Sequence, residues 1–202
     1  MHVRISNTPV ITWELTATMA SSPESPVANN KFHFHNFDVT HQVFHATALS
    51  FAFVNLKPLL PGHVLVSPRR RVTRFTQLTD AEAADLFVTA KRVARTLERV
   101  YSATGFTVPL QDGFDAGQSV PHVHIHLLPR HPADLDHEGG PDAIYDRLEG
   151  NDGDIAAQLF AAKIRKRPRQ PKVDEDALLP RSDEEMAAEA DVLRAEMAKD
   201  LS

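Results

Sequence analysis

Three histidines alternate with apolar residues in the segment His122-Val123-His124-Ile125-His126-Leu127-Leu128. In a β-strand, successive side chains point to opposite faces. The spacing therefore predicts a strand with all three imidazoles on one face and the apolar side chains in a core on the other. Imidazole acts near neutral pH as a nucleophile, a proton carrier or a metal ligand. We expect the chemistry of the protein on this strand.

Two other interpretations of the triplet stay open at this point. The histidines could form a hydrogen-bonded structural cluster on a polar sheet face. They could also bind zinc, because metal ligands often occupy positions i and i+2 of a strand. Zinc would need a further ligand and carboxylates that orient the rings, and the nearest downstream acid is Asp134. The chain has no cysteine, which excludes a thiolate metal site.

Three segments upstream complete a candidate site. Residues Gln111–Val120 contain two glycines among Gln, Asp and Ser, which suits a loop whose backbone N–H groups curl around an anion. Residues Pro61–Pro68 read as a turn that leads into a short strand, with His63 at its entrance. Residues Leu49–Leu56 read as another strand, with Asn55 near its end.

Two capping boxes mark helix starts. The first, Thr79–Glu82, precedes an apolar series at helical spacing that we expect to end at Gly105. The second, Ser182–Glu185, begins a closing helix. Residues Thr107–Gln111 are expected to form a strand, which Pro109 moves toward an edge or bulge. Together these elements predict an α+β fold, with an antiparallel sheet, a long helix packed on it and a C-terminal helix.

The motifs and their order resemble the histidine triad (HIT) superfamily, and within it the fragile histidine triad branch of dinucleoside polyphosphate hydrolases. The matching segments are residues 50–66, 111–120 and 122–128, with weaker similarity over 143–148 and from 182 onward. The resemblance covers roughly residues 32–150 and 181–198. It implies a HIT-like fold and pairing as a homodimer through helix and sheet.

The resemblance also implies a reaction. Members of this branch cleave diadenosine triphosphate to AMP and ADP through a covalent nucleotidyl-histidine, as a bis(5'-adenosyl)-triphosphatase does. His124 matches the nucleophile. His126 and His63 would stabilise charge that develops on the α-phosphate. His122 would hold the geometry between loop and strand, and Gln111 would aid the leaving group near the scissile bridging oxygen.

Further positions match substrate contacts of the family. Asn55 matches a residue that holds a ribose hydroxyl. The phosphate contacts are Gln111, Gly117, Gln118, Ser119, Val120 and His126. The resemblance implies no protein-bound metal and no tightly bound cofactor, whereas Mg²⁺ or Mn²⁺ would assist by neutralising the polyphosphate. Tyr145 matches a tyrosine that the family associates with phosphorylation.

Two alternative functions remain. One is an adenosine phosphoramidate hydrolase of a neighbouring HIT branch, which usually lacks the Gln-Asp-Gly…Gly-Gln stretch found here. The other is a nucleotide-binding signalling protein, whose bound complex is the output. The third triad position carries His126, whereas nucleotidyl transferases of the superfamily tend to carry glutamine there. His126 therefore favours water as the acceptor.

Composition limits partners and compartment. The 202 residues carry a net charge of −5, which gives no basic footprint for nucleic acid. The sequence has no apolar run long enough to span a membrane, and the absence of cysteine fits a reducing compartment. We expect a cytoplasmic protein, with the nucleus as an additional location if the basic tract 163–172 directs import.

The expected domain organisation has four parts. They are a flexible N-terminal extension (1–30), a HIT catalytic domain (31–150), a flexible basic and proline-containing insert (151–181) and a C-terminal helix packed on the domain (182–202).

Overall fold

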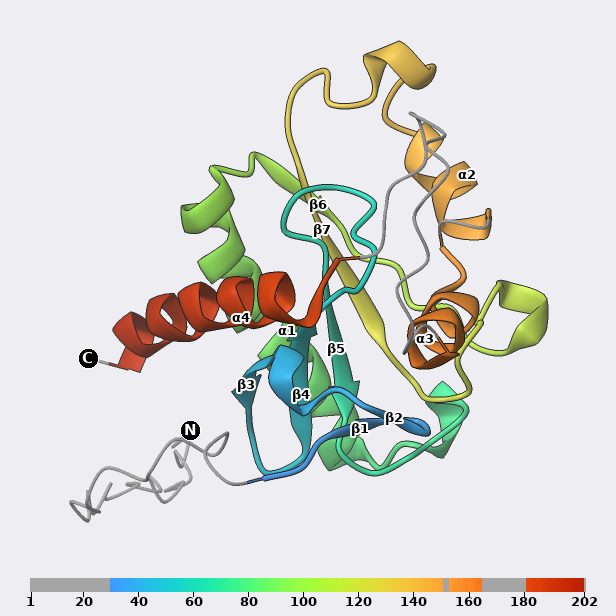
Figure 1. Ribbon diagram of the computed structural model, residues 1–202, viewed down its shortest axis with the longest axis vertical. Helices are drawn as coiled ribbons and strands as arrows, with labels where there is room; N and C mark the ends of the chain where they lie inside the picture. Colours follow the sequence, from blue (N-terminus) through green and yellow to red (C-terminus); the bar gives the residue numbers. More distant parts are fainter. Residues whose placement is uncertain (1–29, 151–152, 165–180, 202) are drawn as a thin grey trace, which may run out of the picture.

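A five-stranded antiparallel sheet forms the centre of the protein (Figure 1). The computed structural model describes residues 30–150, 153–164 and 181–201. Across the sheet the strands follow the order β3 (Val43–Ala46), β4 (Ser50–Val54), β5 (Val64–Pro68), β7 (Ile125–Arg130) and β6 (Gly105–Thr107). A separate two-stranded hairpin consists of β1 (His33–Phe34) and β2 (Phe37–Asp38). The predicted α+β class with an antiparallel sheet is confirmed.

The strand register gives the sheet two different faces. Phe53 of β4 pairs with Leu65 of β5, which pairs with His126 of β7. Paired residues of antiparallel strands lie on the same side, so these three share one face, here called the histidine face. Ile125 and Leu127 alternate with His126 and point to the opposite face, where they join the main core.

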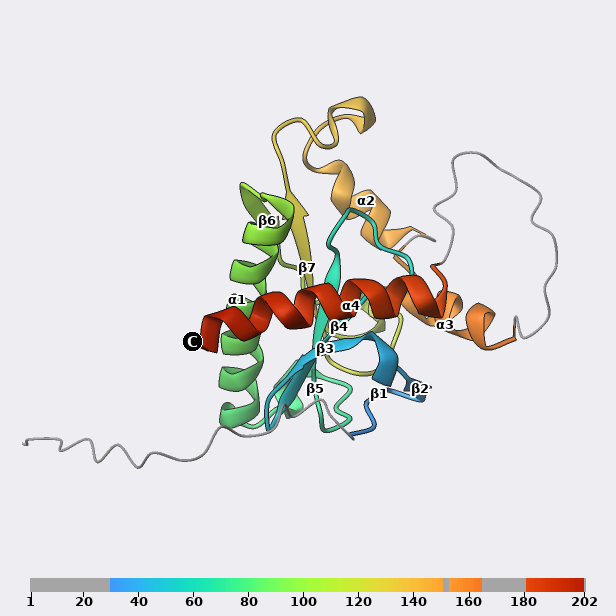
Figure 2. The same cartoon turned by 60° about the vertical axis from the view of Figure 1, so that its left-hand side comes forward.

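Helix α1 (Asp80–Tyr101) covers that opposite face, as Figure 2 shows, with the β1–β2 hairpin on the other side of the sheet. Both halves of its capping box are present, between Thr79 and Glu82, as predicted. The prediction that Gly105 ends the helix is wrong. The helix stops at Tyr101 because Ser102 adopts a left-handed conformation with φ 54°.

The strand expected over residues 107–111 is found two residues earlier in the chain and is only three residues long. Strand β6 begins at Gly105 and ends at Thr107. Pro109, two residues later, has no N–H to donate to a strand ladder, which explains why the strand stops before it. Its carbonyl instead accepts a hydrogen bond from the backbone N–H of His126 at 3.0 Å. The segment that leads into the candidate loop is thereby tied directly to the histidine strand.

Helix α4 (Asp183–Ala198) is the predicted C-terminal helix. It begins with the second capping box, between Ser182 and Glu185, and lies across α1 and the β3–β4 side of the sheet. The side chains that it buries in the main core are Met186, Ala190, Leu193 and Met197.

Two shorter helices complete the described chain. Helix α2 (Ala143–Glu149) closes a small apolar cluster that includes Leu128, two residues after His126. Helix α3 (Ile155–Ile164) packs Ile155 into the main core, so the structure differs here from the expected flexible insert. Most of the basic tract and the N-terminal extension lie outside the described residues. Within the described ranges, no helix is both long and apolar enough to cross a membrane.

Candidate active site

Four histidines converge on the histidine face of the sheet. The rings of His63 and His126 have centroids 5.1 Å apart, and those of His124 and His126 are 5.0 Å apart. His122 contacts the same group through Phe34, whose ring stacks on His122 and meets His124 edge-on. All four imidazoles are at most 1% exposed. The structure therefore brings together all four histidines that the sequence singled out.

The triplet is not a single strand, contrary to the prediction. Strand β7 begins at Ile125, so His122 and His124 precede it. The backbone before the strand is held by other contacts: the N–H of Val123 donates to the carbonyl of Val72 at 2.7 Å, and the Ser67 hydroxyl donates to the carbonyl of Val123 at 2.8 Å. Val123 is nevertheless buried in the main core, so the expected alternation of sides persists outside the ladder.

His122 is fixed at both ring nitrogens. The backbone N–H of His35 donates to His122 Nδ1 at 3.0 Å, so that nitrogen carries no proton. Its Nε2–H therefore donates to the carbonyl of Pro68, 2.9 Å away. With both nitrogens occupied, His122 connects the β1–β2 hairpin to the end of β5 and has no free group for chemistry. This geometry is consistent with the positioning role that the family resemblance implied.

A relay of hydrogen bonds sets the tautomers of His63 and His126. The backbone N–H of Leu59 donates to His63 Nδ1 at 3.2 Å, which places the His63 proton on Nε2. That Nε2 lies 2.9 Å from His126 Nδ1, which must accept the bond. His126 therefore carries its proton on Nε2, a buried N–H with no hydrogen-bond partner among the described residues. The relay leaves a donor ready for an anionic oxygen.

His124 has the complementary arrangement. Its Nδ1 lies 2.7 Å from the backbone carbonyl of His122, an acceptor only, so the proton of His124 is on Nδ1. Its Nε2 then carries the lone pair and, in the described part of the chain, has no hydrogen-bond partner although it is buried. A lone pair on His124 and an N–H donor on His126 thus occupy neighbouring rings. This pairing can attack and stabilise one phosphorus centre.

The environment keeps these imidazoles neutral. Burial lowers the pKa of His124 to about 4 and the pKa of His122 to about 4, in each case with desolvation as the main cause. Burial, with the nearby charge of Arg181 and a contribution from His124, lowers the pKa of His63 to about 3. The pKa of His126 is lowered as well, mainly by burial. At neutral pH His124 therefore presents the neutral form that a nucleophile requires.

Asn55 lies next to His63, at the end of β4. Its Nδ2 is 3.3 Å from His63 Nδ1, and its Oδ1 accepts from the backbone N–H of Lys57. Sequence reasoning missed Arg181, whose guanidinium donates to the carbonyl of Asn55 and pairs with Glu189 of α4. No local pattern could have found this contact, because its partners are 126 positions apart.

The Gln111–Val120 loop is held by hydrogen bonds within itself and by contacts to residues 73–75. Gln118 is buried: its Nε2 donates to the carbonyl of Thr73 at 2.9 Å and its Oε1 accepts from the N–H of Gly113 at 3.1 Å. The N–H groups of Ala116, Gly117 and Gln118 also bond to carbonyls within the loop. The expected curl of free N–H groups around an anion is therefore absent at these positions. Val120 is buried at the end of the loop.

Gly117 adopts a left-handed backbone conformation that favours glycine. Its φ is +82°, and a Cβ atom there would lie 2.5 Å from Nε2 of Gln111. This close approach places the Gln111 side chain against the loop backbone. The substrate-contact roles of Asn55, Gln111 and the loop residues Gly117–Val120 stay predictions.

Hydrogen bonds occupy several ring nitrogens of the histidine cluster. The facing nitrogens of His63 and His126 are used in their mutual hydrogen bond, and both nitrogens of His122 are occupied. In the part of the chain that the structure describes, no group of three or more His, Asp or Glu side chains could hold a metal ion.

The chain is similar in sequence to known proteins that contain a HIT domain. The family model described as HIT domain matches residues 36–133. A Schizosaccharomyces pombe protein named bis(5'-nucleosyl)-tetraphosphatase (asymmetrical) is 44% identical over 172 residues, covering 81% of this chain and 93% of its own length. An Arabidopsis thaliana protein named bifunctional bis(5'-adenosyl)-triphosphatase/adenylylsulfatase FHIT is 47% identical over 154 residues, covering 76% and 77%.

A solved structure agrees with the sequence relatives. The crystal structure of the Caenorhabditis elegans NitFhit protein superposes with a TM-score of 0.60 at 40% identity, and the match covers 83% of this chain and 30% of that longer one. The resemblance stated from the motifs is confirmed, and the chain belongs to the histidine triad (HIT) family, with relatives of the fragile histidine triad type.

Proposed function

We propose that the protein is a dinucleoside polyphosphate hydrolase that cleaves diadenosine triphosphate to AMP and ADP. The names of its relatives support this class of substrate. The observation that carries the proposal is the buried lone pair on His124 Nε2 beside the buried N–H donor on His126 Nε2, neither with a partner among the described residues. Phosphoryl chemistry needs such a nucleophile and such an anion donor side by side.

The first step forms a covalent intermediate. His124 Nε2 attacks the α-phosphorus, a P–N bond forms, and the bond to the bridging oxygen breaks as ADP leaves with the electron pair. The imidazole becomes positively charged in this step, and the carbonyl of His122 that accepts its Nδ1–H stabilises that charge. The Nε2–H of His126 stabilises the negative charge on the phosphoryl oxygens.

The second step is hydrolysis of the intermediate. Water attacks the same phosphorus, the P–N bond breaks, and its electron pair returns to His124 Nε2. AMP leaves, and the proton of the water passes to solvent. Asn55, Gln111 and the loop residues Gly117–Val120 are the proposed substrate contacts. We propose no protein-held metal and no tightly bound cofactor, and Mg²⁺ or Mn²⁺ acts by neutralising the polyphosphate.

Product analysis tests this function. The purified protein is incubated with diadenosine triphosphate, diadenosine tetraphosphate and an adenosine phosphoramidate, with Mg²⁺ or with a chelator. We expect preferred conversion of the triphosphate to AMP and ADP, with Mg²⁺ changing the rate but not the products. Because the relatives include both a tetraphosphatase and a triphosphatase, the two substrates are compared at equal concentration.

Other results would favour the two alternative functions. Preferred cleavage of the phosphoramidate would move the protein to the neighbouring HIT branch. Tight binding of the dinucleotides without turnover would instead support a nucleotide-binding signalling protein.

A homodimer is the proposed assembly. Strand β6 is the last strand of the sheet, so one of its edges is unpaired within the described chain. Two apolar side chains in the segment that follows it are exposed, Val108 at 49% and Phe114 at 89%. Light scattering should give the mass of two chains, and Val108→Asp/Phe114→Asp should give one. Val192→Asp, on the exposed side of α4, is the control that should stay dimeric. A monomeric wild type would contradict the proposal.

A further inference from the structure

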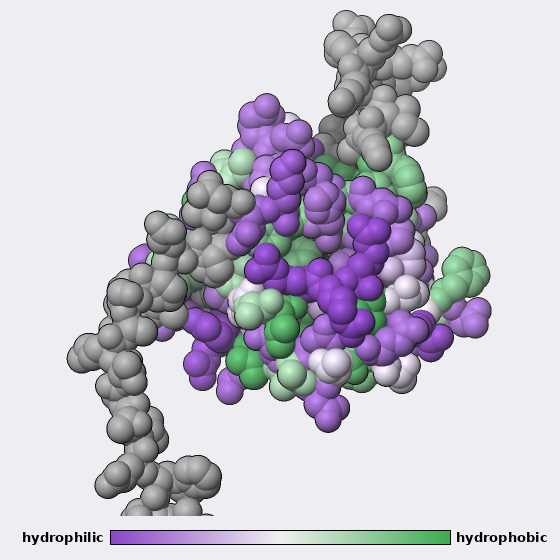
Figure 3. Space-filling view, turned by 90° about the horizontal axis from the view of Figure 1, so that it is seen from below, coloured by the Kyte–Doolittle hydropathy of each residue, from purple (hydrophilic) through white to green (hydrophobic). Residues whose placement is uncertain are grey.

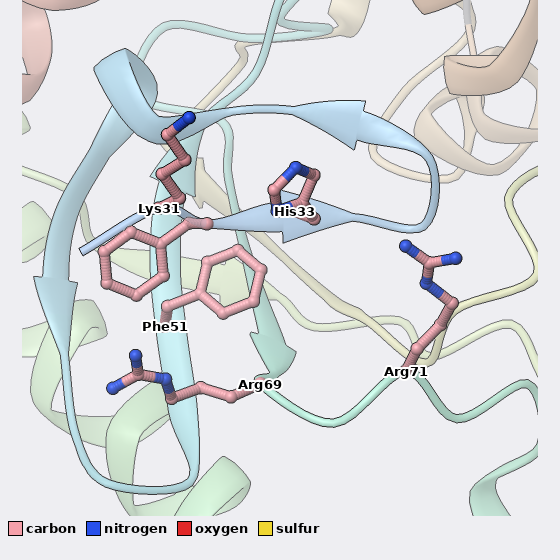
Figure 4. Close-up of a pocket in the computed structure, with 6 residues that line it drawn as sticks. Lys31, His33, Phe51, Arg69 and Arg71 are labelled. Atoms are coloured by element: carbon pink, nitrogen blue, oxygen red, sulfur yellow. The ribbon is translucent and has the colours of Figure 1, made fainter.

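A pocket of about 310 Å³ is lined by none of the four histidines of the site (Figure 4). Its lining residues are Lys31, Phe32, His33, Phe51, Arg69 and Arg71. The rings of Phe32 and Phe51, 5.4 Å apart, form its floor. Aromatic contacts from Phe51 through Phe53 to Phe34 connect this floor to His124. None of the residues that line the pocket takes part in the proposed hydrolysis.

The two pocket arginines differ from the arginine between them. Arg70 forms a paired contact with both carboxylate oxygens of Glu82. Arg69 donates instead to the carbonyl of Thr47 at 3.2 Å, and Arg71 donates to the side-chain oxygen of Asn36. Among the described residues, no carboxylate forms an ion pair with Arg69 or Arg71, and a guanidinium carries five N–H donors. Neutral acceptors thus orient both arginines, and each guanidinium has further N–H groups that could donate to a ligand.

The Arg69 guanidinium also covers the aromatic floor. It lies 5.0 Å from the centroid of the Phe32 ring, and both floor rings are almost fully buried. The rings therefore offer no open face on which a nucleobase could stack. They provide a low-dielectric base that strengthens interactions with the charges above it. The pocket suits the anionic part of a ligand rather than its aromatic part.

The pocket is lined by basic side chains, although the net charge of the whole chain is negative. Lys31 joins Arg69 and Arg71 around the pocket, while the chain as a whole has a net charge of −5. The charge of Asp38 interacts with His33 and Lys31, and its side-chain oxygen accepts from the backbone N–H of Thr40. Among these described residues, the three basic side chains of the pocket outnumber this carboxylate. Figure 3 shows the underside of the molecule, where strongly hydrophilic side chains gather next to hydrophobic ones.

We propose that this pocket is a second anion site that binds an oligophosphate group, either free inorganic polyphosphate or the phosphate chain of a nucleotide. Planar guanidinium groups match the oxygens of phosphate in a bidentate manner. A volume of about 310 Å³ is at the small end of ligand pockets, which fits two or three phosphates. The site rests on its own residues and holds whether or not the triad is a hydrolase.

Calorimetric titration of the full chain with tripolyphosphate tests the proposal. We expect Arg69→Gln/Arg71→Gln to weaken binding about tenfold or more, because two charge-assisted contacts are lost. The matched control, Lys91→Gln/Arg95→Gln, removes the same charge from the exposed side of α1 and should bind like the wild type. Unchanged binding in the pocket variant, or equal weakening in the control, would overturn the site. The single variant Arg71→Gln should show part of the loss.

Two further arms separate the pocket from the triad and identify the source of the phosphates. His124→Ala/His126→Gln should retain tripolyphosphate binding, and loss there with retention in Arg69→Gln/Arg71→Gln would overturn the proposal. If Arg69→Gln/Arg71→Gln weakens the binding of ADP as much as that of tripolyphosphate, a nucleotide is identified as the source. If the variant weakens the binding of tripolyphosphate alone, inorganic polyphosphate is identified. Both results support the site. Adenosine, which has no phosphate, should not bind at this pocket.

Discussion

Replacing His124 with alanine is expected to lower turnover of diadenosine triphosphate about a thousandfold or more, while substrate affinity changes little. The substitution removes the Nε2 lone pair that would form the covalent bond. It leaves the Nε2–H of His126 and the relay from Leu59 through His63, because those hydrogen bonds do not involve His124. Single-turnover kinetics and equilibrium binding of the substrate measure the two quantities separately.

A half-buried histidine outside the site provides the control for this variant. His45 of β3 lies on the α1 side of the sheet, near Asp85 and Arg92, and its pKa is lowered to about 4, mainly by burial. His45→Gln should therefore keep turnover close to that of the wild type. Robust residual activity in His124→Ala, with the fold intact, would rule out His124 as nucleophile.

Mild acid is expected to destabilise the folded protein strongly. The pKa values of His122 and His124 are about 4 in the folded state, against 6.5 for the ordinary imidazole. Below pH 6.5 the unfolded chain therefore binds protons that the folded chain excludes. Stability is full above that pH and falls as the pH drops toward 4. Each such histidine lowers the free energy of unfolding by about 2 kcal/mol between pH 7 and pH 5.

Urea unfolding at pH 7 and pH 5 measures this loss. The window isolates the histidines, because the paired carboxylates of Glu82 and Asp134 have folded pKa values of about 2 and their stabilisation is lost only as the pH falls below the ordinary carboxyl pKa of about 4. His124→Ala should lose less stability between the two pH values than the wild type, since one buried imidazole is absent. Equal unfolding free energies at pH 7 and pH 5 in the wild type would show that the cluster is not held neutral by burial.

The parts of the fold that follow from local pattern could be predicted from the sequence. The capping boxes at Thr79 and Ser182 place both long helices, because the cap is made by residues three positions apart. The end of α1 was missed because a left-handed Ser102, and not Gly105, stops it. A non-glycine residue in that conformation leaves no clear mark in the sequence.

In the candidate site, too, the sequence predicted some features, and others depend on contacts between distant residues. The motif order brought His63 and the triad together correctly, because the family resemblance carries long-range information. The tautomers could not be predicted, since they depend on backbone groups such as the N–H of Leu59 and the carbonyl of His122. The hydrogen bonds of the Gln118 side chain to the backbone of Thr73 and Gly113 could not be predicted either, because a glutamine in a loop can contact a ligand or stabilise the loop.

The stereochemistry of the reaction at phosphorus tests covalent catalysis by His124 most directly. A diadenosine triphosphate analogue that is chiral at the α-phosphorus through sulfur substitution is hydrolysed in isotopically labelled water, and the configuration of the product is determined. Two successive in-line displacements, first by His124 Nε2 and then by water, give net retention of configuration. Net inversion would mean that water attacks the substrate directly and that no nucleotidyl-histidine lies on the pathway.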